Sequence, residues 1–143
     1  MKQQILLPGD GKSYQWSKDH VLVKASVDLT DGRLTLVEDT LKPGFALARH
    51  HHKRMTEIFY ILDGSVEFVF DDERIHARPG TVINVPSNVW HEVKSSQGAR
   101  LLTIFSPGGF DRYLEELVAL TEAQYADAAL MRGLSERYDI FEV

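Results

Sequence analysis

Pairs of turn-forming residues recur along the chain at a spacing that suits short β-strands. They occur at Asp31-Gly32, Pro43-Gly44, Asp63-Gly64 and Pro79-Gly80. The segments between them, from about residue 5 to residue 106, are short apolar runs or alternate between apolar and polar residues. This rhythm is typical of an all-β sandwich or barrel. The clearest predicted strands are 20–26, 33–41, 45–52, 57–62, 66–70, 81–85, 91–94 and 101–105.

The hydrophobic period changes to that of a helix after residue 109. A first amphipathic helix is predicted to begin near Phe110. A second is predicted to begin after Thr121, which can cap it together with Gln124, and to end near Gly133. We expect this tail, residues 109–138, to cover one face or the mouth of the barrel. A lid or a contact with a partner subunit is the alternative.

Length and charge limit the function classes. With 143 residues, 43% of them hydrophobic, the chain can bury one core, so we expect a single domain over residues 1–143. The net charge of −5 argues against nucleic acid as a partner. There is no cysteine, so a metal would have to bind nitrogen and oxygen. No stretch is apolar enough for a signal peptide or a membrane span, and we expect a cytoplasmic protein without membrane contact.

A run of histidines supplies the first part of a candidate metal site. His50 and His52 are two residues apart in a predicted strand, so their side chains project from the same face, while His51 points the other way. Glu57 follows the short irregular segment 53–56 and begins the next strand, from which its carboxylate can join the two imidazoles.

The fourth candidate ligand is His91. A turn at Pro86, Ser87 and Asn88 brings it to the start of another strand, and asparagine tolerates the left-handed backbone that such turns often need. Three imidazoles and a carboxylate favour one divalent transition metal per chain, such as Fe, Mn, Ni, Co or Zn, over magnesium or calcium. We interpret the other histidines as surface or hydrogen-bonded residues: His20, His51 and His76.

These four residues occur in a pattern that resembles the two-part signature of the cupin superfamily. The first part is matched throughout, by Gly44, His50, His52, Glu57 and Gly64 at the family's spacing. The resemblance implies a cupin jelly-roll β-barrel, here with C-terminal helices.

The second part of the signature is matched with two departures. Gly80, Pro86 and His91 are in place, but Asn88 stands where the family usually has glycine, and Ser95 where it often has asparagine. Neither departure affects a ligand. The ending from Phe105 through the helices also looks like the tail of small quercetin dioxygenase-like cupins.

The resemblance leaves three functions open. The first is a dioxygenase-like oxidoreductase acting on a small aromatic, phenolic or enediol substrate, in which the family implies that Glu57 is both ligand and catalytic base. The second is an isomerase or polyketide-type cyclase that uses the metal as a Lewis acid. The third is a small-molecule binding protein without catalysis. Apolar walls for such a ligand are predicted from Phe59, Ile61, Phe68 and Phe70.

The strand that begins at Glu57 has a second apolar face. Ile58, Tyr60 and Leu62 lie opposite Glu57 and need cover. Small cupins resemble one another in pairing their sheets across a dimer. We therefore expect a homodimer in which the N-terminal strands form the contact.

Overall fold

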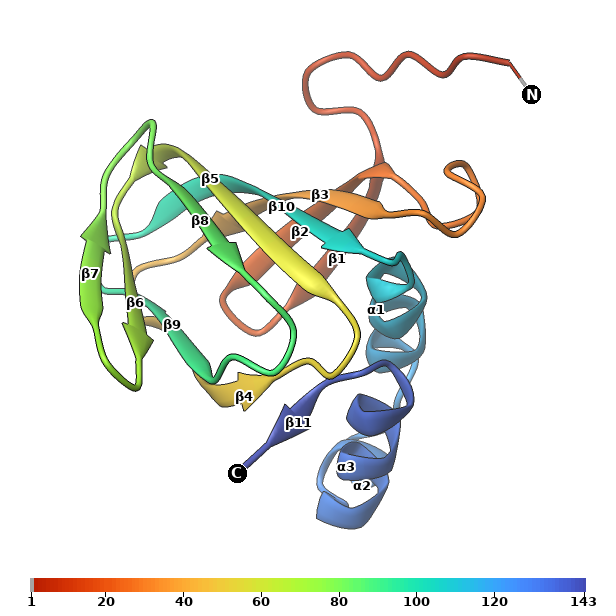
Figure 1. The fold of residues 1–143 in the computed structure, drawn as a ribbon. Coiled ribbons are helices and arrows are strands. Elements are labelled where there is room, and N and C mark those ends of the chain that lie inside the picture. The colour runs from red at the N-terminus through yellow and green to blue at the C-terminus, as the bar shows by residue number, and fades with distance from the viewer. Residues whose placement is uncertain (1) are drawn as a thin grey trace.

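Two antiparallel sheets face each other and form a barrel with helices at one side (Figure 1). The structure is a computed structural model that describes residues 2–143. The larger sheet contains, in spatial order, β1 (Lys12–Trp16), β2 (Asp19–Ala25), β3 (Thr35–Leu41), β10 (Ala99–Ser106), β5 (Thr56–Gly64) and β8 (Val82–Val85). The smaller contains β11 (Phe141–Glu142), β4 (Phe45–His51), β9 (His91–Ser95), β6 (Val66–Phe70) and β7 (Arg74–Ala77). The predicted all-β jelly-roll barrel with C-terminal helices is confirmed.

Strand alternation places the core between the sheets. In β3 and β10, every second residue is buried, and these inward side chains meet those of β5. The barrel core contains fully buried residues such as Ile61, Val66 and Phe68. Each such side chain contributes about 1.5–3 kcal/mol by leaving water.

Three strands were not predicted from the sequence. β1 and β7 are short and carry charged or polar side chains on their exposed positions, which hides the alternation. β11 has only two residues and exists because its backbone pairs with β4, with Phe141 opposite His51 and Glu142 opposite His50. No local signal marks a strand of this length.

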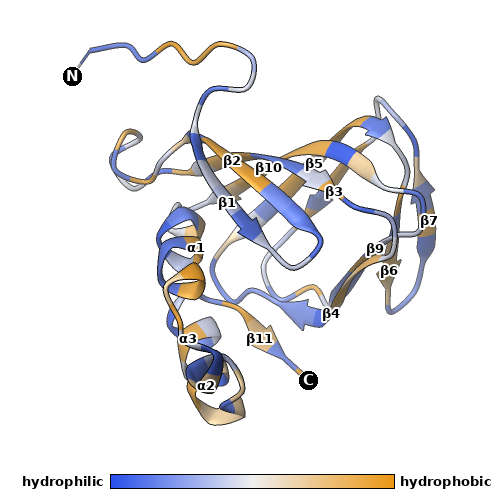
Figure 2. Ribbon diagram, turned by 180° about the vertical axis from the view of Figure 1, so that it is seen from behind, coloured by the Kyte–Doolittle hydropathy of each residue, from blue (hydrophilic) through white to orange (hydrophobic). Residues whose placement is uncertain are grey.

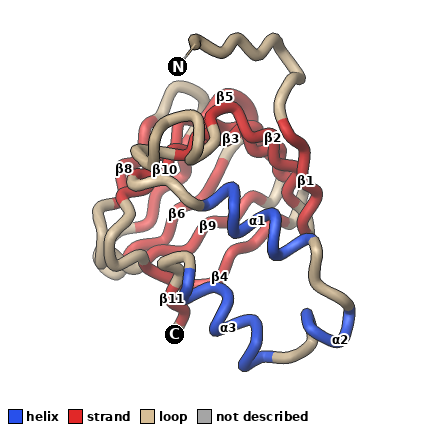
Figure 3. The backbone as a smooth tube through the Cα atoms, turned by 90° about the vertical axis from the view of Figure 1, so that its right-hand side faces the viewer, coloured by secondary structure: helices blue, strands red, loops and turns tan. Residues whose placement is uncertain are grey.

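The C-terminal tail forms three helices rather than the two expected. Figure 3 shows their arrangement beside the barrel. α1 (Phe110–Val118) occurs where it was predicted, with apolar and polar residues on different sides (Figure 2). Thr121 and Gln124 make the predicted capping box, but the helix that they begin, α2 (Glu122–Tyr125), is a single turn. Asp127 then caps α3 (Ala128–Arg137) by accepting from the backbone N–H groups of residues 129 and 130. α3 therefore continues past Gly133, where the sequence predicted an end.

The helices lie beside the barrel. Phe110 of α1 stacks on Phe105 of β10, with ring centroids 4.1 Å apart. Tyr113 and Leu117 of α1 pack with Leu134 of α3 in a separate apolar cluster. The tail thus extends the interior of the barrel instead of lying loosely on its surface. Among the described residues, no helix is long and apolar enough to cross a membrane.

Candidate metal centre

The four predicted ligands, distant in sequence, converge inside the barrel. His50 lies in β4, His52 directly after it, Glu57 in β5 and His91 at the start of β9. Their nearest ligand atoms all lie within 4.8 Å of one another. All four side chains are buried, with His91 fully inaccessible. A structure without a metal would leave four polar groups packed together in the interior, at a high cost in desolvation.

A bulge in β4 is what turns the two histidines inward. The strand begins with Phe45 and Leu47 on the inner side, so strict alternation would next bring Arg49 and His51 inward. Its pairing with β9 shifts between Leu47 and His50. The extra residue reverses the alternation, so that His50 is buried in the cluster.

His51 consequently lies outside the cluster. Its ring packs on Trp90, with centroids 4.1 Å apart, and lies 5.5 Å from the ring of Phe141 in β11. The remaining histidines are also away from the cluster: His20 is hydrogen-bonded to Ser13 and His76 pairs with Glu67.

Each imidazole of the cluster is held through its Nδ1 atom. Nδ1 of His50 lies 2.8 Å from the carbonyl oxygen of Ala48, and Nδ1 of His91 lies 2.9 Å from that of Val89. Nδ1 of His52 lies 2.8 Å from the carbonyl oxygen of Asp139. A carbonyl oxygen can only accept, so each Nδ1 carries the proton and each Nε2 is available as a ligand. Such outer partners fix the tautomer and orientation of metal-binding histidines.

Glu57 lies among the imidazoles. Its Oε1 is 3.1 Å from Nε2 of His52 and 3.2 Å from Nε2 of His91. Two ligand atoms at right angles, each about 2.1 Å from one ion, would be about 3.0 Å apart. The spacing and the N/O donor set therefore fit a first-row divalent metal.

The pKa shifts of His50 and Glu57 suit metal binding, whereas the shift of His52 opposes it. Burial, aided by the neighbouring His91, lowers the pKa of His50 to about 4. Burial would raise the pKa of Glu57, but hydrogen bonds with His52 and His91 outweigh it and lower that pKa to about 2. Burial would lower the pKa of His52, but Glu57 outweighs it and raises that pKa. At neutral pH the site thus offers an ionised carboxylate and a neutral His50.

Asp139 positions the loop between His52 and Glu57, a role that no sequence pattern indicated. Its carboxylate accepts from the backbone N–H groups of Lys53, Arg54 and Met55, at 2.8–2.9 Å. Burial opposes ionisation of Asp139, but these three bonds lower its pKa overall. Because the same residue's carbonyl oxygen holds His52, the C-terminal tail is part of the support of the site.

The turn before His91 takes the conformation that its asparagine allows. Asn88 has a φ of 66°, in the left-handed region. Its backbone N–H donates to the carbonyl oxygen of His52, at 2.6 Å. The turn that delivers one ligand is thereby joined to another.

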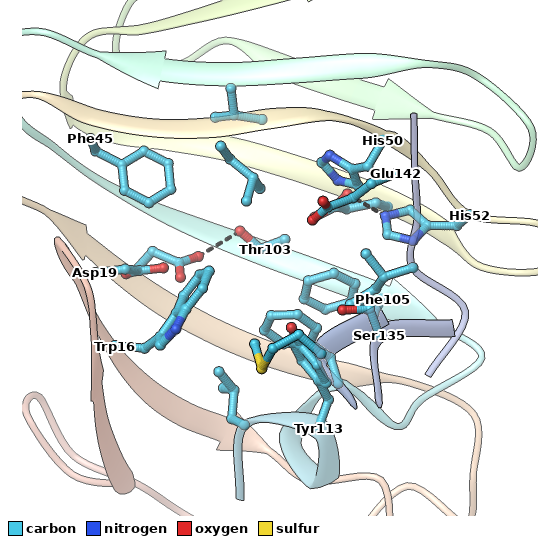
Figure 4. Close-up of a pocket in the computed structure, with 18 of the residues that line it drawn as sticks. Trp16, Asp19, Phe45, His50, His52, Thr103, Phe105, Tyr113, Ser135 and Glu142 are labelled. Atoms are coloured by element: carbon cyan, nitrogen blue, oxygen red, sulfur yellow. Dashed lines mark hydrogen bonds and ion pairs between the residues drawn. The ribbon is translucent and has the colours of Figure 1, made fainter. Parts of the chain in front are cut away.

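The cluster opens onto a cavity of about 430 Å³ between the barrel and the helices (Figure 4). Its walls are largely apolar, and Phe59 is the one predicted pocket residue that lines it. Ile61 and Phe68, also expected there, do not: both are fully buried in the barrel core beyond Phe59. Phe70 packs against the same core from a half-buried position. Ile61 faces the interior of the barrel, but the sequence did not indicate how far along the barrel axis it lies. Much of the cavity wall comes instead from other elements: Trp16, Phe45, Leu47, Leu101, Phe105, Phe110, Tyr113, Leu114 and residues of α2 and α3.

Besides the exposed Glu136 and Glu142, two buried carboxyl groups line the cavity away from the metal cluster. They belong to Asp19 at the start of β2 and Asp39 in β3 (Figure 4 labels Asp19). Thr103 Oγ1 donates to Asp39 Oδ2 at 2.7 Å. The sequence analysis missed this group, although a signal existed: Asp39 occupies an inward position of β3 between Val37 and Leu41.

Comparisons with known proteins agree with this architecture. Residues 37–105 match a family described as "Cupin domain". Over 114 residues, 79% of this chain, the sequence is 29% identical to quercetin 2,3-dioxygenase of Bacillus subtilis (strain 168), and the match covers 34% of that relative. The chain therefore spans about a third of the curated relative that it matches.

Solved structures show the same fold at low identity. KdgF from Halomonas sp. superposes with a TM-score of 0.68 at 18% identity, covering 76% of this chain and 99% of that one. The polyketide cyclase RemF from Streptomyces resistomycificus gives a TM-score of 0.65 at 19% identity, covering 73% of this chain and 80% of that one. At these identities the likeness concerns the fold alone.

Proposed function

We propose that the chain, whose residues 37–105 match the cupin domain, is a metal-dependent oxidoreductase of the dioxygenase type. We propose a small substrate with a phenolic or enediol group, and one divalent transition metal held by His50, His52, Glu57 and His91. The observation that carries the proposal is a buried three-histidine, one-carboxylate cluster that opens onto a largely apolar cavity. Such a cavity binds a small, mostly apolar molecule and excludes water.

When bound, a redox metal would supply a centre at which the deprotonated substrate and dioxygen react, with both oxygen atoms entering the product. The protein's own part is to bind, orient and deprotonate the substrate. Oε1 of Glu57 contacts His52 and His91. Oε2 is therefore the atom that we propose accepts the proton of the substrate hydroxyl. Phe105 is opposite Glu57 in the sheet and Phe59 lies two residues further along β5; both line the cavity and would hold an aromatic ring.

The likeness to a quercetin 2,3-dioxygenase supports this choice over other cupin chemistries. The test has two stages. Elemental analysis of protein purified without added metal should find close to one transition metal per chain. Oxygen uptake is then measured for the iron, manganese, nickel and cobalt forms with a panel of flavonols, catechols and enediols, using His50→Ala as the metal-poor control. Absence of uptake by every form would refute the proposed activity.

A Lewis-acid function is the second candidate, because the polyketide cyclase RemF shares the fold. In that case the same cluster would hold a metal that polarises a substrate carbonyl, and Glu57 would move a proton next to it. Turnover by the zinc form, or turnover without oxygen, would favour this candidate over the oxidoreductase.

We also propose that the chain forms a homodimer. The outer face of the larger sheet carries Tyr60 and Val82, opposite each other in β5 and β8 and 43% and 54% exposed. Ile58 and Leu62 extend this face, as the sequence suggested. Its contact with a second copy would remove apolar surface from water. Light scattering should give twice the chain mass, and Tyr60→Lys should reduce it to the monomer.

A further inference from the structure

Asp19 and Asp39 form a pair of carboxyl groups inside the barrel. They lie on neighbouring strands and are only 9% and 7% exposed. In the antiparallel register, Asp39 is opposite Val21, so the two acids are diagonal neighbours on the inner face of the sheet. Both line the cavity into which the metal cluster opens.

The pair holds a proton at neutral pH. Burial, reinforced by the charge of Asp39, raises the pKa of Asp19 to about 10. Burial also raises the pKa of Asp39, although hydrogen bonds with Asp19 and Thr103 oppose the rise. Since the contact between the two raises one pKa and opposes the rise of the other, Asp19 is the donor and Asp39 the acceptor. Thr103 also donates to Asp39, which agrees with this assignment.

Apart from the contact between the two acids, Thr103 is the one residue among residues 2–143 that donates to their carboxyl groups. Oδ1 of Asp19 is buried and has no hydrogen-bond partner among residues 2–143. Buried polar atoms almost always have a partner, and an unpaired one costs about 1–3 kcal/mol. Other side chains of the cavity wall do not supply a donor to the pair: Leu41 and Phe45 are apolar, and Nε1 of Trp16 donates to Tyr125. A bound molecule with a donor group can approach the pair from the cavity that both acids line.

The acid pair and the metal cluster are separated along the larger sheet. Glu57 in β5 is opposite Phe105 in β10, which in turn is opposite Thr35 in β3. Asp39 lies four residues further along β3 than Thr35. Between the two polar groups the cavity wall contains Phe59, Leu101 and other apolar side chains.

We propose that the Asp19–Asp39 pair is a second recognition site, which binds a hydroxyl or amino substituent at the far end of the substrate. This rests on the proposed function, because the other end of the same molecule is the phenolic or enediol group at the metal cluster. The substrate class is thereby narrowed to elongated molecules with an apolar middle and a hydrogen-bond donor at each end. A site built to satisfy a donor discriminates against an analogue without it.

Two matched probes test this proposal. 3-Hydroxyflavone and 3,4′-dihydroxyflavone share the same chelating end and differ only in a distal hydroxyl. Their dissociation constants with the metal-loaded protein are measured by fluorescence titration without oxygen, so turnover is not required. We expect the dihydroxy probe to bind about tenfold more tightly, as one hydrogen bond to a charged pair provides. 

Substitutions of Asp19 and Asp39 test whether the preference for the dihydroxy probe depends on the acid pair. Asp19→Leu/Asp39→Leu removes both polar groups while keeping similar size and should reduce the ratio of the two dissociation constants to about one. Asp19→Asn resembles the protonated acid and should keep a preference for the dihydroxy probe. Thermal unfolding of each variant confirms that it is folded.

The outcomes separate this site from the proposed activity. Equal binding of both probes to the wild type, including no measurable binding of either, would overturn the acid-pair site. So would an unchanged ratio in the double leucine variant. Hydroxyl-dependent binding that the double variant loses supports the site, even if no form of the protein consumes oxygen.

Discussion

The cavity has two polar regions that are equally buried but held together in different ways. At the metal cluster, every imidazole has a backbone carbonyl behind it, and Glu57 is ionised between them. At the acid pair, one carboxyl group must keep a proton, and Oδ1 of Asp19 lacks a partner. The first region is arranged to receive a cation, and the second to receive a hydrogen-bond donor.

This difference shows that burial alone does not determine whether a carboxyl group is ionised. Glu57 and Asp39 are both deeply buried, and burial raises the pKa of each. Two histidines next to Glu57 reverse the direction, whereas a second acid next to Asp39 does not. Neighbouring side chains therefore shift the pKa values of two buried carboxyl groups in opposite directions within one cavity.

The largest expected effect is the loss of metal from His50→Ala. Removing a direct ligand should lower metal affinity by more than about a hundredfold, above the effect of losing an outer partner. Competition with a chelator followed by elemental analysis measures it. The matched control is His51→Ala, one residue away on the opposite face, which should keep its metal. Equal loss from both variants would contradict the inward assignment of His50.

Asp139→Asn should have the next largest effect. The variant keeps a residue that tolerates the left-handed backbone at this position, where φ is 66°, but weakens the bonds to the loop before Glu57. Metal affinity should fall about 10-fold to 100-fold, as it does when outer partners are lost. The same chelator competition measures it.

A second tail variant separates this role from general stability. Asp127→Ala removes the cap of α3 and should cost about 1 kcal/mol of folding stability. It should leave metal affinity unchanged, because Asp127 has no contact with the loop. If both variants lowered affinity equally, the tail would support the site only through its overall stability.

The acid pair should respond in the opposite direction to the metal cluster. Replacing both acids by leucine removes two buried polar groups from an apolar wall. We expect the free energy of unfolding in urea to rise by about 1–3 kcal/mol. A loss of stability would mean that the pair contributes to folding, and would remove one reason to assign it a binding role.

The two regions also differ in the pH dependence of stability. Because the pKa of Asp19 is raised to about 10 from its ordinary 3.8, its contribution to stability is fully present below about pH 4 and is lost as the pH rises toward 10. Asp19→Asn removes this titration, so its stability relative to the wild type should increase with pH over that range. The slope cannot exceed about 1.4 kcal/mol per pH unit. Urea unfolding at several pH values measures it, and parallel curves would mean that Asp19 is ionised in the folded protein.

Much of the fold and the membership of the metal cluster could be predicted because both depend on local pattern. The turn pairs delimit the strands, and the spacing of His50, His52 and Glu57 brings these residues together once strands form. Ile61 and Phe68 lie in the interior, but strand alternation does not indicate how far along the barrel a residue lies. Of the four expected pocket residues, only Phe59 lines the cavity.

The sequence by itself determined which residues could share a face, because side-chain direction alternates along any strand. It put His50 with His52 and apart from His51. Only the tertiary structure decided that this face is the inner one, since the bulge in β4 arises from pairing with β9. Contacts between distant segments also created the support of His52 by Asp139 and the pairing of Asp19 with Asp39. Such contacts depend on the three-dimensional path of the chain, which the local spacing of residues does not determine.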